Sequence, residues 1–262
     1  MKSARLLLPL IDIEEKRRVR RIELINKINN LKPAEEILKQ SIEKEIEELN
    51  SLIPKCPELL ILDVGCFTQE AKKYYPPWVR YLGIDAASYH QETKVVDLNH
   101  GFLPIPCSHA LCLETLEHLL DPMDTLRSIS ESLSHGGYLV VSLPNEATIF
   151  HRIRSLLGTV DAECFSGEGK HLHLPSLSQS REFLRKIQEL ELQKELYYIS
   201  PTACGTRGPV IVGKILSLIH PHIHQFLADR FPSLFSRGFI FLLKKTTPDN
   251  TLTQDSAQSQ PS

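Results

Sequence analysis

Acidic residues close three short apolar segments of this chain, in positions where they could bind a polar ligand. Asp63 and Gly65 end the first segment, Asp85 ends the second, and Asp97 follows the third. If these segments are parallel strands, their carboxyl ends expose backbone amides and helix N-termini to a ligand at one edge of the sheet. Each acid alone has a second interpretation as an ordinary turn or cap residue. Their recurrence at successive strand ends favours a shared binding site.

The residue types indicate adenosine as the ligand. The Asp85 carboxylate can accept both hydroxyls of a ribose, the Asp97 carboxylate can take the adenine amino group, and Leu98 offers its backbone amide to the ring. A dinucleotide site would need glycines in a Gly-x-Gly-x-x-Gly pattern after the first strand. Phe67 and Glu70 stand at the second and third of those positions. The pattern therefore favours an adenosine compound without a pyrophosphate.

The elements that must position these residues follow from short apolar runs separated by turns and helical stretches, which is typical of a parallel sheet with crossover helices. The chain as a whole is expected to form an α/β fold. Strands are expected at residues 59–64, 80–85, 93–96, 109–113, 138–142, 195–199 and 238–244. Helices are expected at residues 69–75, 122–134 and 178–190.

The two ends of the chain differ from this central part. Apolar residues recur at helical spacing after Pro33, which suits the first turn of an amphipathic helix. We therefore expect a helical extension over residues 1–54, a ligand-binding domain over 55–245, and a disordered tail over 246–262, which is polar and rich in turn residues.

Composition excludes several classes of protein. With 262 residues, 42% hydrophobic content and a net charge of -2, the chain can bury a substantial core and carries no excess charge that would indicate nucleic acid or an anionic membrane as a partner. No apolar run approaches the roughly 20 residues that span a bilayer. The six cysteines form no Cys-x-x-Cys pair, which favours a reducing, cytoplasmic location.

The order of these motifs resembles that of class I S-adenosylmethionine (SAM) dependent methyltransferases of the type 11 and type 23 groups. The resemblance covers residues 55–190 and rests on five segments: LDVGC (62–66), LGID (82–85), VVDLNHGFLPIP (95–106), LCLETLEHLLDP (111–122) and LSHGGYLVVSLPN (133–145). Individually weaker phrases, among them SLPN (142–145), HLH (171–173) and RFPSLF (230–235), resemble the MetW branch and extend the match to residue 244. Members of that branch are linked to methionine biosynthesis.

The resemblance implies a Rossmann-like fold with a mostly parallel seven-stranded sheet and helices on both faces. It implies SAM as the cofactor and a small molecule as the methyl acceptor. Glu117 and His118 are candidates for taking the acceptor's proton, although packing or helix capping is an equally simple role for His118. The residues implied to line the SAM pocket are Asp63, Gly65, Asp85, Asp97, Leu98 and Glu114.

One departure from the family pattern keeps a second function open. Phe67 and Gln69 stand where the family usually has glycines, near the place of the methionine part of SAM. The alternative is therefore a MetW-like, non-catalytic or SAM-sensing subunit that supports a partner enzyme such as a homoserine acyltransferase. The intact Asp85 and Asp97 favour the enzyme.

Two histidine repeats could supply metal ligands. His171-x-His173 and His220-x-His222-x-His224 would each place imidazoles on one face of a strand. Neither repeat comes with a ligand of a third type in a known spacing. The sequence therefore predicts no metal site.

Overall fold

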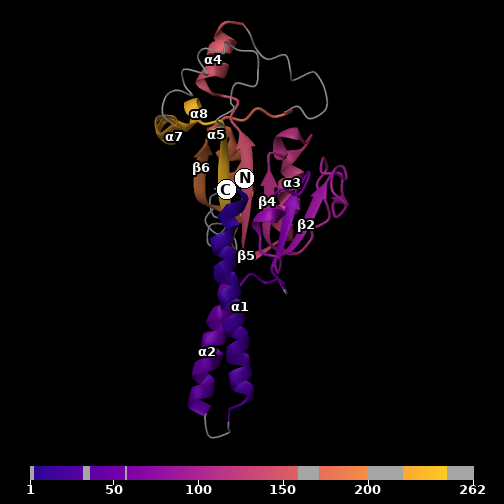
Figure 1. Cartoon of the computed structure of the whole chain (residues 1–262), viewed down its shortest axis with the longest axis vertical. Coiled ribbons are helices and arrows are strands. Elements are labelled where there is room, and N and C mark those ends of the chain that lie inside the picture. Colours follow the sequence, from indigo (N-terminus) through magenta and orange to yellow (C-terminus); the bar gives the residue numbers. More distant parts are fainter. Residues whose placement is uncertain (1–2, 32–35, 57, 159–170, 200–220, 247–262) are drawn as a thin grey trace, which may run out of the picture.

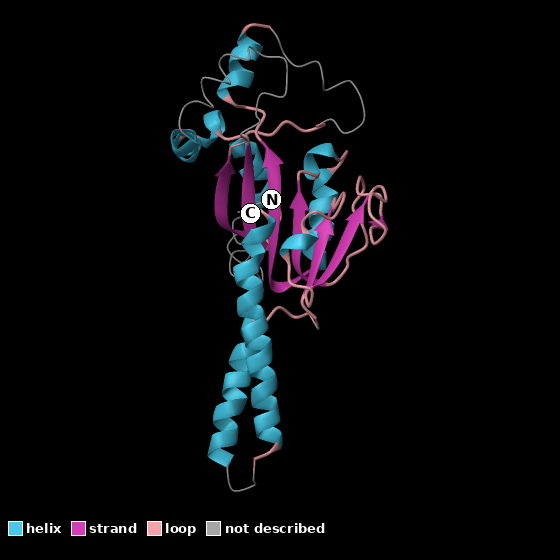
Figure 2. Cartoon of the chain, in the orientation of Figure 1, coloured by secondary structure: helices cyan, strands magenta, loops and turns pink. Residues whose placement is uncertain are grey.

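A computed structural model describes residues 3–31, 36–56, 58–158, 171–199 and 221–246. A sheet forms its centre (Figure 2). It has seven strands in the order β3-β2-β1-β4-β5-β7-β6. The first five strands in this order run parallel, and β7 is antiparallel to both of its neighbours. The strands are β1 (Leu60–Val64), β2 (Arg80–Asp85), β3 (Lys94–Val95), β4 (Cys107–Leu113), β5 (Leu133–Pro144), β6 (Leu190–Tyr198) and β7 (Gly238–Lys245).

The mostly parallel sheet and its antiparallel closing pair confirm the fold class expected from the sequence. The helices are α1 (Leu8–Asn29), α2 (Glu36–Leu52), α3 (Pro122–Ser132), α4 (Ile149–Leu156), α5 (Leu177–Arg185), α7 (Pro221–Arg230) and α8 (Pro232–Phe235), with shorter 3₁₀ turns η1 (Ala4–Leu7), η2 (Lys72–Tyr74) and η3 (Leu116–His118). In the part of the chain that is described, no helix is both long and apolar enough to cross a membrane.

Two apolar clusters cover the two faces of the sheet. One contains buried residues of α3 and α5, such as Leu126, Ile129 and Leu184. The other is formed with the start of the chain, where Ala4, Leu7 and Ile11 are fully buried. The remainder of α1 pairs with α2 in a hairpin that extends away from the sheet, opposite to the end that carries α4, α7 and α8 (Figure 1). The parallel strands point toward the α4 end.

The N-terminal segment occupies the face where the sequence predicts a helix at residues 69–75. That prediction is wrong, because the short link between β1 and β2 forms turns and only the 3₁₀ turn η2. Backbone with positive φ at Phe67 and Gln69 prevents a helix from starting directly after β1. The Tyr75 hydroxyl donates to the Ala4 carbonyl oxygen at 2.6 Å, which ties the link to η1.

A buried contact between Glu14 and His109 fixes α1 to the sheet. The Glu14 carboxylate lies 3.0 Å from His109 Nε2 of β4 and 2.8 Å from the Arg18 guanidinium. Glu14 and His109 are only 3% and 1% exposed, so both polar groups have left water. Their mutual contact is therefore needed to offset desolvation. Further along the hairpin, Arg20 of α1 pairs with Glu45 of α2 at 2.9 Å.

Other predicted elements differ in extent or type. The helix expected at 178–190 ends at Arg185, because Leu190 already begins the edge strand β6. Residues 221–230 form helix α7, so a common strand face for His222 and His224 is wrong, and His220 lies outside the described residues. The tail predicted to be disordered lies outside them as well, apart from its first residue.

Candidate functional site

The loop after β1 folds over the end of β2. Gly65 has φ 74°, and Phe67 and Gln69 follow with φ 43° and 56°, so two non-glycine residues adopt the left-handed conformation. This conformation costs an L-residue roughly 1–2 kcal/mol. The Gly65 and Phe67 amides are both used: Gly65 N–H donates to the Ile84 carbonyl at 2.9 Å, and Phe67 N–H donates to Asp85 Oδ2 at 2.8 Å. The chain thus keeps a glycine-like loop despite its larger side chains.

The side chains of Phe67 and Gln69 contact residues of other segments. The Phe67 ring is 57% exposed and contacts the Tyr89 ring at a centroid distance of 4.6 Å. Gln69 is buried, and its Nε2 donates to the Thr93 hydroxyl at 3.1 Å. The loop therefore holds Asp85 through its backbone, while the side chains of Phe67 and Gln69 contact Tyr89 and Thr93.

Asp85 and Asp97 remain available to a ligand. Besides the Phe67 amide, Asp85 accepts the Ala87 N–H at 3.4 Å, and a carboxylate has about four lone-pair sites in all. Asp97 is exposed and accepts the Asn99 backbone and side-chain N–H groups at 3.0 and 3.1 Å. These bonds, the backbone one foremost, lower the pKa of Asp97 and keep it ionised. Both acids are thus oriented carboxylates at neighbouring strand ends.

Leu98 has a structural role beside its predicted contact with adenine. Its side chain is 2% exposed and belongs to the core, and its carbonyl oxygen accepts the Thr125 hydroxyl of α3. The next residue, Asn99, accepts the Leu120 N–H at 3.0 Å. The loop after β3 is therefore held against the start of α3.

Asp63 is the most buried of the acidic residues that are predicted to line the pocket. It is 4% exposed and accepts the Tyr81 hydroxyl. Burial raises the pKa of Asp63 to about 7, a rise opposed by the Tyr81 hydrogen bond and increased by the nearby Asp85 charge. Asp63 is therefore a buried carboxyl at the end of β1 that Tyr81 holds in place.

The raised pKa makes stability depend on pH. A buried acid binds its proton more tightly in the folded state, so its contribution is full below the unfolded pKa near 4 and is lost as pH rises through about 7. Between about pH 5 and pH 8 this carboxyl should cost the wild type about 3 kcal/mol of unfolding free energy. The Asp63→Asn variant should lack this loss in denaturant titrations at the two pH values. An equal change in unfolding free energy between the two pH values for both proteins would contradict the raised pKa of Asp63.

Glu114 and Thr115 join the ends of β4, β5 and β6 to the loop after β1. Glu114 Oε1 accepts the Ser142 hydroxyl at 2.7 Å and the Tyr198 hydroxyl at 3.0 Å. The Thr115 hydroxyl donates to the Leu113 carbonyl at 3.0 Å, and its side chain lies directly against Gly65. The structure therefore brings Gly65 and Glu114 to one edge of the sheet, and their place in a common pocket stays a prediction.

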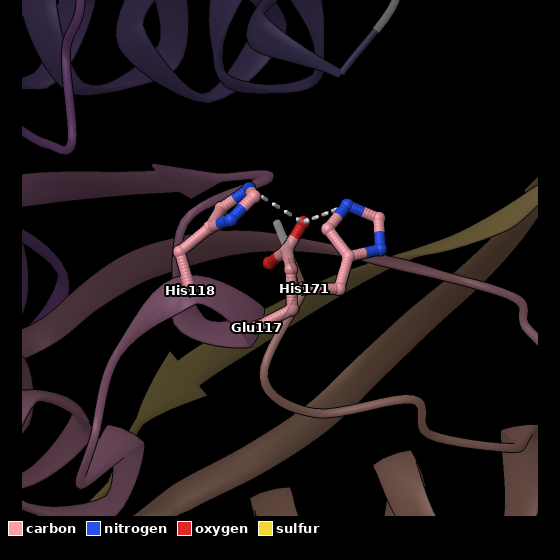
Figure 3. Close-up of side chains that lie close together, drawn as sticks. All are labelled: Glu117, His118 and His171. Carbon is pink, nitrogen blue, oxygen red and sulfur yellow. Dashed lines mark ion pairs between the residues drawn. The ribbon is translucent and has the colours of Figure 1, made fainter. Parts of the chain in front are cut away.

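A second group of side chains gathers just beyond Glu114 (Figure 3). The buried Glu117 carboxylate has its Oε1 3.9 Å from His118 Nε2 and 4.0 Å from His171 Nε2. Burial, followed by the Glu114 charge, raises the pKa of Glu117 to about 7. Glu146 Oε1 lies 3.0 Å from His171 Nδ1, and this hydrogen bond is the main reason that the pKa of His171 is raised.

The sequence singled out Glu117 and His118 but missed Glu146 and the partnership with His171. The sequence pattern pairs His171 only with His173, whose Nε2 lies 2.9 Å from the Leu119 carbonyl oxygen and so serves a backbone contact. The Leu172 and His173 amides donate to the Glu117 carbonyl oxygen at 2.7 and 3.1 Å. No local sequence pattern reports that pairing, because it joins segments far apart in the chain.

The sheet order, the antiparallel β7 and the acids at the ends of β2 and β3 agree with the class I methyltransferase fold that the sequence resembles. A family model described as a methyltransferase domain matches residues 33–188, which is more than half of the chain. The protein belongs to this methyltransferase-domain family. Among curated proteins, no relative matches the chain.

Solved structures with related folds include proteins from bacteria and archaea. The YcgJ protein from Bacillus subtilis matches with 14% identity over 77% of this chain and 98% of its own, at a TM-score of 0.48. A SAM-dependent methyltransferase from Methanosarcina mazei matches with 17% identity over 73% and 94%, at 0.47. A SAM-dependent methyltransferase from Mesorhizobium loti matches with 16% identity over 77% and 97%, at 0.45.

Proposed function

We propose that the protein binds SAM at the carboxyl ends of β1, β2 and β3 and transfers its methyl group to a small-molecule acceptor. The observation that carries this proposal is the Asp85 carboxylate, which the Phe67 amide holds at the end of β2. The exposed Asp97 carboxylate and the Leu98 backbone stand at the neighbouring strand end, where they suit the adenine ring. Membership of the methyltransferase-domain family supports the same ligand.

The reaction needs alignment more than it needs a strong base. The acceptor's nucleophilic atom attacks the methyl carbon, the carbon–sulfur bond breaks, and its electron pair stays on sulfur to give S-adenosylhomocysteine. Holding the two substrates in line lowers the entropic cost, and excluding water favours a step in which positive charge on sulfur is lost. The protein's part is therefore to hold the adenosine through Asp85 and Asp97 and to enclose the reacting atoms.

Glu117 and His118 are the proposed acceptors of the proton that the nucleophile releases. The pKa of Glu117, raised to about 7, suits a general base at neutral pH. The side chain of His118 is 32% exposed beside it and gives the proton a route to solvent. Full turnover after replacement of both residues would contradict these roles.

The direct test is calorimetric titration with SAM and with S-adenosylhomocysteine. The wild type should bind both with micromolar affinity. Asp85→Ala removes a charged acceptor from two ribose hydroxyls, which should cost about 2–3 kcal/mol and weaken binding roughly 30- to 150-fold. The matched control is Asp124→Ala on α3, whose carboxylate pairs with Arg127 at 2.8 Å and which should bind as the wild type does.

Two results would overturn the proposal. One is that neither ligand binds the wild type, which would mean that Phe67 and Gln69 close the site; binding gained by Phe67→Gly would identify the cause. The other is an Asp85→Ala variant that binds as tightly as the Asp124→Ala control. The four cysteines that are described, Cys56, Cys66, Cys107 and Cys112, are free thiols, which supports the cytoplasm as the location in this proposal.

The second candidate is a MetW-like, non-catalytic subunit that supports a partner enzyme such as a homoserine acyltransferase. The observation in its favour is the outer face of α1, where Val19, Ile22 and Ile25 are 45%, 56% and 36% exposed on the extended hairpin. A pull-down that returns an acyltransferase, lost on replacing Ile22 with aspartate, would favour this function. Methyl transfer to a metabolite from a cell extract would favour the enzyme.

A further inference from the structure

The Glu117 carboxylate is the most unusual polar group at the edge of the sheet. Its side chain is fully buried, and neither of its oxygens has a hydrogen-bond partner within the described part of the chain. Leaving a buried charged group without partners is costly, and such a group calls for a specific compensation. His118 Nε2 and His171 Nε2 both face Glu117 Oε1, from 3.9 and 4.0 Å.

We propose that Glu117, His118 and His171 bind a divalent transition-metal ion. Their ligand atoms all lie within 4.8 Å of one another, and they converge from η3 and from the segment before α5 (Figure 3). A cation between them would compensate the buried carboxylate. The site was not evident in the sequence because its third ligand lies more than fifty residues from the other two.

The ligand set determines the class of metal. Two imidazole nitrogens and one carboxylate oxygen suit Zn²⁺, Fe²⁺, Mn²⁺ or Co²⁺, whereas Mg²⁺ and Ca²⁺ prefer oxygen ligands alone. Glu146 accepts a hydrogen bond from His171 Nδ1, which fixes the tautomer whose Nε2 lone pair faces the site. A carboxylate behind a ligating histidine is the usual outer support of a metal site.

The geometry needs a modest adjustment. A tetrahedral ion ~2.1 Å from each ligand atom would separate those atoms by roughly 3.4 Å. Each imidazole must therefore approach Glu117 by about half an ångström, and the two imidazoles, whose ligand atoms lie within 4.8 Å of each other, must approach each other by up to about 1.4 Å. The two segments are already joined, because the Leu172 and His173 amides donate to the Glu117 carbonyl oxygen. Side-chain rotation of the two histidines, which are 32% and 31% exposed, can supply the rest.

Three protein ligands leave coordination positions for water or for an oxygen or nitrogen of a second molecule. The side chains of His118 and His171 are partly exposed, so these positions face outward. The site lies just past Glu114, where the end of β4 meets the SAM pocket of the proposed function. Resting on that function, the ion would bind the methyl acceptor and lower the pKa of its nucleophilic group, and Glu117 and His118 would then act as ligands rather than as bases.

Titration of the tag-free, chelator-treated protein with Zn²⁺, followed by calorimetry, tests the site. One ion per chain should bind with micromolar or tighter affinity, and Mg²⁺ should bind far more weakly. His171→Ala should weaken Zn²⁺ binding by a factor of at least about 100, and Glu146→Gln by about 10 to 100. The matched control is His173→Ala, which removes a neighbouring imidazole that faces the Leu119 carbonyl.

Thermal unfolding gives a second readout that does not require activity. Zn²⁺ should raise the melting temperature of the wild type and of His173→Ala, but not that of His171→Ala. Binding that is the same in the wild type and in His171→Ala would show only adventitious surface histidines and would overturn the proposal. So would a wild type that binds no Zn²⁺.

The metal site and the SAM site can fail separately. Asp85→Ala should still bind Zn²⁺ as the wild type does, because Asp85 contributes no ligand atom to the cluster. His171→Ala should still bind SAM. A wild type that binds Zn²⁺ but not SAM would overturn the proposed function alone. A wild type that binds SAM but not Zn²⁺ would overturn the metal site alone.

Discussion

Replacing Glu14 with alanine is expected to lower the free energy of unfolding by about 2–3 kcal/mol, because the change leaves the buried Nε2–H of His109 without the carboxylate oxygen that faces it. His109 is 1% exposed at the centre of the sheet, and its Nδ1 already accepts the Tyr138 amide at 3.2 Å. Its Nε2 therefore carries the proton and depends on Glu14. Arg18 would also lose its 2.8 Å contact. Guanidinium titration followed by circular dichroism measures the loss.

Two control variants test whether the loss of stability comes from the contacts of Glu14 rather than from any substitution on α1. Glu15→Ala, one position along α1, removes a carboxylate that is less buried and should change stability by less than about 0.5 kcal/mol. Glu14→Gln keeps a hydrogen-bond acceptor and should fall between the two. If Glu14→Ala unfolds at the same denaturant concentration as Glu15→Ala, the contact between Glu14 and His109 does not hold α1 on the sheet.

The contact between Glu14 and His109 is one part of the fold that the sequence could not predict. Strands β1, β2 and β4 were predictable because buried parallel strands are nearly continuous apolar runs. The role of the chain's first residues was not, because Leu7 and Ile11 read only as a short apolar run. Their packing depends on a face left free by the short link between β1 and β2. A helical extension over residues 1–54 therefore begins inside the core of the sheet.

The candidate site shows the same division. Asp85, Asp97 and Gly65 stand at strand ends, and strand ends can be located from local patterns. The positions of the Phe67 and Gln69 side chains could not be predicted, because each depends on a partner from another segment. Phe67 contacts Tyr89, and Gln69 donates to Thr93. Local patterns predict where a ligand site lies, whereas tertiary contacts decide which side chains enter it.

Replacing Gly65 with alanine should have the largest effect on the site itself. A Cβ at this position would overlap the hydroxyl and methyl groups of Thr115, and φ of 74° would strain any L-residue. Thr115 cannot retreat without losing its hydrogen bonds to the Val64 and Leu113 carbonyls. We expect a loss of stability of about 3 kcal/mol or more, as strain and overpacking add.

Gly136 provides the matched control for this prediction. Its φ is 80°, yet nothing lies within 4 Å of an added Cβ, so Gly136→Ala measures the backbone strain alone, about 1–2 kcal/mol. The excess loss in Gly65→Ala reports the contact with Thr115. Because the same loop carries the Phe67 amide to Asp85, displacing it should also abolish calorimetric SAM binding, which Gly136→Ala should leave intact. Equal stability and equal SAM affinity in the two variants would mean that the loop after β1 can move freely, and that the close approach of Gly65 to Thr115 does not hold Asp85 in place.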